Sequence, residues 1–201
     1  MATFKDYHWI LASRSPRRRQ LLRDAGWEFD VIPASDVAED TIRPKELPSQ
    51  YAERLARQKA EDVANAFLSG KKEGIGKDSR PIAVIGCDTI AVCHGEILGK
   101  PIDVNDARRM LQMLRGNEHE AISGLCLIDV ASGKKKVQHD RTILFMRDVA
   151  DETLENYLCS RQWEGKAGAF GYQDGNDWLT LVSGSESNVV GLPLELLMKM
   201  I

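Results

Sequence analysis

Residues 9–32 read WILASRSPRRRQLLRDAGWEFDVI. The apolar start, Trp9–Ala12, predicts a short buried strand. Ser15-Pro16 predicts the start of a helix, because serine is a good N-cap and proline suits the first helical position. Gly26 is expected to end that helix, and the alternation of apolar and acidic residues over Trp27–Ile32 predicts a second strand. The order strand, helix, strand is typical of an α/β fold.

The middle of the chain continues this alternation. Apolar residues at spacings of three and four predict a long helix from Pro48 to about Leu68. The continuous apolar run Pro81–Cys87 predicts a central strand buried on both faces, with Asp88 directly at its end. Thr89–Val92 and Glu96–Leu98 predict two further strands joined by a tight turn.

The last hundred residues predict the remaining elements, which comprise a helix capped by Asp103, strands at 119–130 and 137–147, a helix capped by Asp151, a strand at 178–182 and a short helix from 192. No linker, repeat or low-complexity tract interrupts the pattern. We therefore expect residues 1–201 to form a single α/β domain.

Composition excludes several classes of protein. The chain has 201 residues, 43% hydrophobic and 28% charged, which is too apolar for a disordered chain and too charged for a membrane bundle. The net charge of −3 argues against electrostatic binding of nucleic acid over a broad surface, although it does not exclude a local basic patch. No apolar run approaches the roughly 20 residues that span a bilayer, so no membrane partner is expected. The four cysteines form no Cys-x-x-Cys pair, and the start of the chain lacks a signal-peptide pattern, so a cytosolic location is expected.

The first candidate site lies at the start of the predicted helix after Ser15. Arg17, Arg18 and Arg19 fall in its first turn, where they add positive charge to the positive end of the helix dipole. A bound anion such as a phosphate would explain this arrangement. The alternative is a solvated basic patch.

Asp88 and three lysines are the other candidates, and each has an ordinary alternative. Asp88 could bind a metal or accept a proton, or it could be a turn or cap residue. Lys100 and Lys166 follow glycines and could bind phosphate as point charges, or they could belong to simple turns. Lys59 could be an exposed helix lysine, and Glu39 an ordinary acidic residue of a polar loop.

Missing motifs narrow the chemistry. The four histidines form no His-x-x-x-His pair, so a zinc hydrolase has no support. The chain has no Gly-x-Ser-x-Gly elbow, no P-loop, and no Gly-x-Gly-x-x-Gly after the first strand. Dispersed phosphate-binding candidates and one prominent aspartate indicate a phosphate ester or nucleotide as substrate.

Ordered motifs from residue 11 to residue 194 then point to a family. They read LASRSPRR at 11–18, RLA at 54–56 with KA at 59–60, DT at 88–89, GEILGKP at 95–101, SG at 123–124, KAGAFGYQ at 166–173 and NVVGLPL at 188–194. In this order the chain resembles the Maf family of nucleoside triphosphate pyrophosphatases.

The resemblance implies hydrolysis of a nucleoside triphosphate to the monophosphate and pyrophosphate. It implies a mixed central sheet flanked by helices, with two lobes and a nucleotide cleft, as in the Maf and inosine triphosphatase folds. It also implies a divalent cation, Mg²⁺ or Mn²⁺, and for some members a link to septum formation and cell-division arrest. A homodimer is common in such families.

Three positions sort the subgroups of this family. Arg17, Thr89 and Gln173 match the branch that acts on dTTP and UTP, whereas the 7-methyl-GTP branch tends to carry Trp, Gln and Glu there. Two departures stand out. Glu186 replaces a tyrosine that is more usual in the pyrimidine branch, and Phe170 replaces another tyrosine.

The same resemblance gives Asp88 its role, and a mechanistic hypothesis consistent with it gives the other residues theirs. Asp88 takes the proton-acceptor position and would share the cation with Glu39. Ser13, Arg17 and Arg18 would hold the triphosphate, and Gln173 would meet the imide edge of the base. The remaining cations, which would neutralise the leaving pyrophosphate, are Lys59, Lys100 and Lys166.

Three alternatives stay open at this point. One is a broader Maf pyrophosphatase, or one directed at 7-methyl-GTP. Another is a cell-division regulator that needs no catalysis, and the third is a nucleic-acid-binding module built on the arginine cluster.

Overall fold

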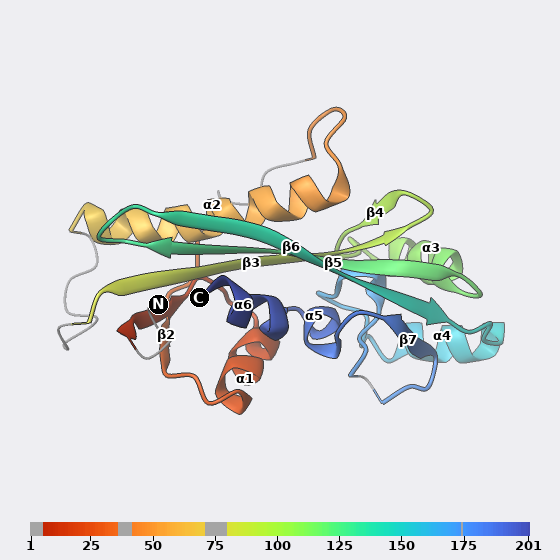
Figure 1. The fold of residues 1–201 in the computed structure, drawn as a ribbon. Helices are drawn as coiled ribbons and strands as arrows, with labels where there is room; N and C mark the ends of the chain where they lie inside the picture. Colours follow the sequence, from red (N-terminus) through yellow and green to blue (C-terminus); the bar gives the residue numbers. More distant parts are fainter. Residues whose placement is uncertain (1–5, 36–41, 71–79, 174) are drawn as a thin grey trace.

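The strands of the protein form one mixed sheet, seen in a computed structural model that describes residues 6–35, 42–70, 80–173 and 175–201. The order across the sheet is β2-β1-β3-β5-β6-β7, and β4 pairs with β3 (Figure 1). The described strands are β1 (His8–Leu11), β2 (Phe29–Val31), β3 (Ile82–Cys93), β4 (Glu96–Leu98), β5 (Glu118–Asp129), β6 (Lys135–Met146) and β7 (Leu179–Ser183). The predicted α/β fold with a mixed central sheet is confirmed.

The first strand, helix and strand form as the sequence predicts. Helix α1 (Pro16–Asp24) has Ser15 as its N-cap, and the Ser15 hydroxyl accepts a hydrogen bond from the Arg18 N–H. Gly26 follows the helix with φ of 76°, a backbone conformation that favours glycine. Strand β1 then lies between β2 and β3 and is parallel to both.

Strand β3 corrects one prediction. Its twelve residues run unbroken from Ile82 to Cys93, so Asp88 lies in the middle of a strand and not at its end. On one side β3 pairs with β5 along nearly its whole length. On the other side β1 pairs only as far as Ile85, and β4 begins only at Ala91. The intervening residues therefore form an open edge within the described sheet, where polar side chains reach a cavity.

Helix α2 (Pro48–Leu68) lies along one face of β3, β5 and β6 (Figure 1). Two glycines of the sheet allow this close approach. A Cβ atom at Gly86 would lie 2.2 Å from the Ala56 carbonyl oxygen, and one at Gly124 would lie 2.1 Å from that of Ala52. Both distances are far below van der Waals contact, so backbone atoms set the spacing between α2 and the sheet.

The opposite face carries two hydrophobic clusters, which form the two lobes. The first packs α1 and α6 (Leu194–Met200) against β1 and β3, around Trp9, Leu22 and Leu197. The second packs α3 (Val104–Leu114) and α4 (Asp151–Cys159) near the β3–β4 hairpin, around Leu111 and Trp178. The short helices η3 (Ala167–Ala169) and α5 (Glu186–Val190) complete this face.

The end of the chain differs from the prediction in detail. Helix α5 was not predicted, and α6 begins at Leu194 rather than at residue 192. Ala150 is the N-cap of α4, so Asp151 is its first residue and not its cap. All four cysteines are free thiols. None of the helices in the described ranges has both the length and the apolar character that crossing a bilayer requires.

Candidate active site

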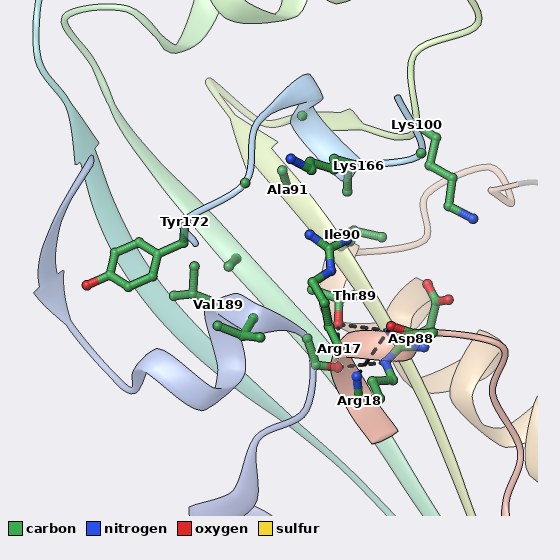
Figure 2. Close-up of a pocket in the computed structure, with 18 of the residues that line it drawn as sticks. Arg17, Arg18, Asp88, Thr89, Ile90, Ala91, Lys100, Lys166, Tyr172 and Val189 are labelled. Atoms are coloured by element: carbon green, nitrogen blue, oxygen red, sulfur yellow. Dashed lines mark hydrogen bonds between the residues drawn. The ribbon is translucent and has the colours of Figure 1, made fainter. Parts of the chain in front are cut away.

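A cavity of about 740 Å³ opens on the edge of β3 where the described residues supply no neighbouring strand. Figure 2 shows side chains from α1, β3 and the loops around η3 turned toward it. Nine predicted site residues line this cavity, namely Ser13, Arg17, Arg18, Lys59, Asp88, Thr89, Lys100, Lys166 and Gln173. The tenth, Glu39, lies outside the described residues.

Asp88 forms an ion pair with Lys59 across the space between β3 and α2. The Lys59 Nζ atom lies 2.5 Å from Asp88 Oδ1, and the two side chains are only 12% and 14% exposed. The alternative of an exposed helix lysine is therefore wrong. Because Gly86 lets α2 approach the sheet one turn from Lys59, the tight packing sets the geometry of the pair.

Arg18 is held by three hydrogen bonds from its guanidinium group. Its Nε donates to the Gly191 carbonyl oxygen at 2.7 Å, one Nη donates to Ser13 Oγ at 3.2 Å, and the other donates to Thr89 Oγ1 at 3.2 Å. Ser13 Oγ also accepts a hydrogen bond from the Ser15 N–H at 3.2 Å. Arg18 is thus fixed at the N-terminus of α1 before any ligand binds.

Arg17, Lys100 and Gln173 contrast with Arg18. Within the described residues, none of their side chains makes a hydrogen bond or an ion pair, so all three can turn toward a ligand. The Gly99 carbonyl accepts a hydrogen bond from the Gly168 N–H at 3.0 Å, which joins the Lys100 loop to the Lys166 loop. The backbone thereby brings two distant lysines to one cavity.

The charge of the cavity lining favours an anion. Six basic side chains line it against three acidic ones. Part of this charge sits at the N-terminus of α1, whose dipole adds to the attraction. Arginine and lysine at such positions are suited to the oxygens of a polyphosphate.

The far end of the cavity is apolar. Figure 2 places Tyr172 and Val189 on the side away from Asp88 and Lys100. The Tyr172 hydroxyl donates to Glu186 Oε1 at 3.1 Å, and burial together with this carboxylate raises the pKa of the tyrosine. The other apolar lining residues include Ala121, Leu144, Phe170 and Leu179. Sequence reasoning did not single out this end, because its side chains come from five segments that lie far apart along the chain.

His119 also lines the cavity and was missed as a site residue. It pairs with Leu144 across β5 and β6, and it is only 6% exposed. Burial lowers its pKa to about 4, and its Nδ1 atom has no hydrogen-bond partner among the residues that the structure describes. The imidazole is therefore neutral at pH 7, and the scattered spacing of histidines in the sequence gave no signal for it.

The described residues contain no group of three or more His, Cys, Asp or Glu side chains arranged to hold a metal ion. A carboxylate does face the cavity at Asp88, where only Oδ1 is paired with Lys59. Mg²⁺ is commonly bound by one or two carboxylates together with phosphate oxygens of the substrate. The donor set is therefore suited to a divalent cation that arrives with a polyphosphate.

Comparisons with known proteins show which family the chain belongs to. The sequence model of a family described as Maf-like protein matches residues 8–201. The dTTP/UTP pyrophosphatase of Rhodopirellula baltica is 47% identical over 193 residues, covering 96% of this chain and 80% of that protein. The dTTP/UTP pyrophosphatase of Ruminiclostridium cellulolyticum is 39% identical, covering 96% and 93%. That of Geotalea uraniireducens is 43% identical, covering 92% and 89%.

Proposed function

The chain belongs to the Maf family, and on this premise we propose that it hydrolyses dTTP and UTP to the monophosphate and pyrophosphate. The observation that carries the proposal is the Asp88–Lys59 pair beside the fixed guanidinium of Arg18, in a cavity with excess positive charge. Relatives named dTTP/UTP pyrophosphatase support the choice of nucleotide.

The triphosphate would bind where the cations converge. Arg18 and Ser13 are already in place at the N-terminus of α1, and Arg17 lies in the same helical turn. Lys100 and Lys166 approach from the linked loops. Together with Lys59, these two lysines would neutralise the charge that builds on pyrophosphate as it leaves, which lowers the barrier for the reaction.

Asp88 would act as the general base. Water attacks the α-phosphorus, the bond from that phosphorus to the bridging oxygen breaks, and the water proton passes to the carboxylate. Lys59 orients the carboxylate through Oδ1, which leaves Oδ2 for the water or a cation. Asp88 and Glu39 would hold the divalent cation, which would supply Lewis-acid polarisation.

The base would occupy the apolar end of the cavity. Gln173 offers both a donor and an acceptor, and a uracil or thymine ring presents both at its imide edge. Tyr172 and Val189 provide apolar surface for the ring. Arg17, Thr89 and Gln173 are the residues by which we assign this chain to the pyrimidine branch.

The proposal includes a cytosolic location and requires neither nucleic acid nor membrane as partner. The acidic balance of the chain, with 27 basic against 30 acidic residues, supports the absence of nucleic acid. The homodimer that the resemblance implies can be measured by light scattering of the purified protein.

The test is pyrophosphate release from dTTP, UTP, CTP, GTP and 7-methyl-GTP with Mg²⁺, repeated with Mn²⁺ and with a chelator. We expect strong preference for dTTP and UTP, and loss of activity with the chelator. Preference for 7-methyl-GTP would keep the reaction but refute the assignment from Arg17, Thr89 and Gln173. If the folded protein releases no pyrophosphate from any nucleotide, the proposed enzymatic activity is refuted. That result would favour the alternative of a cell-division regulator that needs no catalysis.

A further inference from the structure

A chain of buried polar side chains on β5, β6 and α5 leads to Arg18 through Thr89. Ser123 on β5, Thr142 on β6 and Asn188 on α5 are all fully buried, at 0% exposure. Fully buried polar groups are retained where their hydrogen bonds have a purpose, because each would otherwise lose free energy on leaving water. None of the three is among the residues that line the cavity.

Thr89 is the link between this chain and the site. Its Oγ1 lies 2.7 Å from Ser123 Oγ and 3.2 Å from the Gly191 carbonyl oxygen, to which it donates. Thr89 Oγ1 also accepts a hydrogen bond from the Arg18 guanidinium at 3.2 Å. The Thr89 hydroxyl therefore accepts from Arg18 and donates to the Gly191 carbonyl oxygen, with Ser123 Oγ as its third partner inside the protein.

The Gly191 carbonyl oxygen is the second point that fixes Arg18. It accepts from Arg18 Nε at 2.7 Å, from Thr89 Oγ1 at 3.2 Å and from the Cys87 thiol at 3.2 Å. Gly191 has φ of 122°, which an L side chain rarely adopts. The carbonyl can be presented in this direction because glycine occupies the position.

Asn188 sets the place of that carbonyl. Its Nδ2 donates to the Ala121 carbonyl oxygen at 3.0 Å and to Thr142 Oγ1 at 2.9 Å, which holds the short helix α5 on β5 and β6. Gly191 follows three residues later, at the end of α5. The Asn188 carbonyl oxygen also lies 3.5 Å from Ser123 Oγ. The contact to Arg18 through Thr89 and the contact through Gly191 are therefore connected.

We propose that Thr89 and Ser123 are positioning residues that preorganise the Arg18 guanidinium for the triphosphate. The inference deepens the proposed function and rests on it. Ser123 cannot touch a nucleotide, since it is buried beneath Thr89, so its effect must pass through the threonine hydroxyl. An arginine held before binding loses less conformational entropy when the ligand arrives, and the gain appears as affinity.

Three variants test this role. Thr89→Val keeps the shape of the side chain but removes the hydroxyl, and Thr89→Ser keeps the hydroxyl. We expect Thr89→Val and Ser123→Ala each to raise KM for dTTP by about fivefold with little change in kcat. Thr89→Ser should stay within about twofold of wild type. A merely structural role would lower the amount of folded protein without this division between KM and kcat.

A double-mutant cycle identifies the route. In an Arg18→Lys background, Thr89→Val and Ser123→Ala should cause almost no further loss, because their partner is already gone. In a Lys100→Ala background the same two changes should keep their full effect, since Lys100 has no bond to this chain of residues. Full additivity with Arg18→Lys would overturn the inference.

The same cycle is repeated with the dissociation constant for inorganic pyrophosphate, measured by calorimetry. This readout separates the two claims, because it needs no turnover. If the wild type releases no pyrophosphate from any nucleotide, the proposed function fails while the binding cycle still decides the role of Thr89 and Ser123. Equal pyrophosphate affinity in wild type and Thr89→Val would overturn the positioning role even if the enzyme is active.

Discussion

The two ends of the cavity are built in different ways. At the end near α1, directional contacts hold the charged groups, as in the 2.5 Å pair of Asp88 with Lys59 and the three hydrogen bonds of Arg18. At the other end, Tyr172 and Val189 present apolar surface with a single hydrogen bond at the rim. Charge-assisted contacts depend steeply on distance and geometry, whereas apolar contact tolerates adjustment. A substitution of a given size should therefore reduce activity far more at the charged end than at the apolar end.

The largest effect is expected from Asp88→Asn. The change keeps the shape of the side chain but removes the general base, so turnover of dTTP should fall by about 10²–10⁴. Initial rates of pyrophosphate release at saturating substrate measure it, and circular dichroism confirms the fold. Activity within tenfold of wild type would remove Asp88 from the role of base and weaken the contrast between the ends.

The next effect is a loss of folding stability as the pH falls. Its source is His119, which is buried on the sheet side of the cavity. Its folded pKa of about 4 lies below the usual 6.5, so the unfolded chain takes up the proton first as pH falls. The contribution of His119 to stability is complete above pH 6.5 and is lost progressively toward pH 4. Between pH 7 and pH 5 we expect a loss of about 2 kcal/mol in the free energy of unfolding.

Urea unfolding at pH 7, 6 and 5 measures this slope, with His119→Leu as the comparison. Glu46 has a pKa lowered to about 2, chiefly by its hydrogen bond with Arg54, so its own contribution is lost only below about pH 4.5. It therefore does not interfere in the chosen range. An equal slope in His119→Leu would show that the histidine is not its source.

A smaller effect is expected for Lys100→Ala. Lys100 is exposed and makes no bond within the described residues, so its loss should leave stability unchanged and lower kcat/KM for dTTP by about tenfold. Lys134→Ala is the matched control, because Lys134 is an exposed lysine in the β5–β6 turn, outside the cavity lining. Salt should narrow the difference between the Lys100 variant and wild type. The idea fails if both variants behave alike.

The smallest effect is expected for Tyr172→Phe at the apolar end. The ring stays and only the hydrogen bond to the exposed Glu186 is lost, so kcat/KM for UTP should change by about twofold at most. Steady-state kinetics with UTP and dTTP measure the change. A loss above tenfold would mean that the hydroxyl serves the substrate directly, and the two ends would then be alike.

Local signals explain which parts of the fold could be predicted. Ser15, Pro16 and Gly26 mark the ends of α1, and the regular apolar spacing defines α2. Strand β3 was divided at Asp88 because a carboxylate in a buried run indicates an end. The strand continues there because β5 pairs with it without a break from Ala83 to Val92, and this long-range pairing leaves no local signal in the sequence.

The residues of the candidate site were likewise predictable only in part. Charged residues stood out in the sequence because their positions at helix ends and beside glycines are unusual. Ser123 and Asn188 were noted only as parts of family motifs and were given no role, and His119 is an ordinary residue in its own segment. Their importance arises from the register of β5 against β3 and β6, which places Ser123 opposite Thr89 and His119 opposite Leu144.

The close approach of α2 to Gly86 and Gly124 has a consequence for engineering. Replacing glycine by alanine commonly stabilises a protein by restricting the unfolded chain. Here a single added methyl group would collide with the backbone of α2 at 2.2 or 2.1 Å and push the helix outward. Because Lys59 travels with that helix, thermostability and turnover would be lost together. Engineering for higher thermostability should therefore not substitute Gly86 or Gly124.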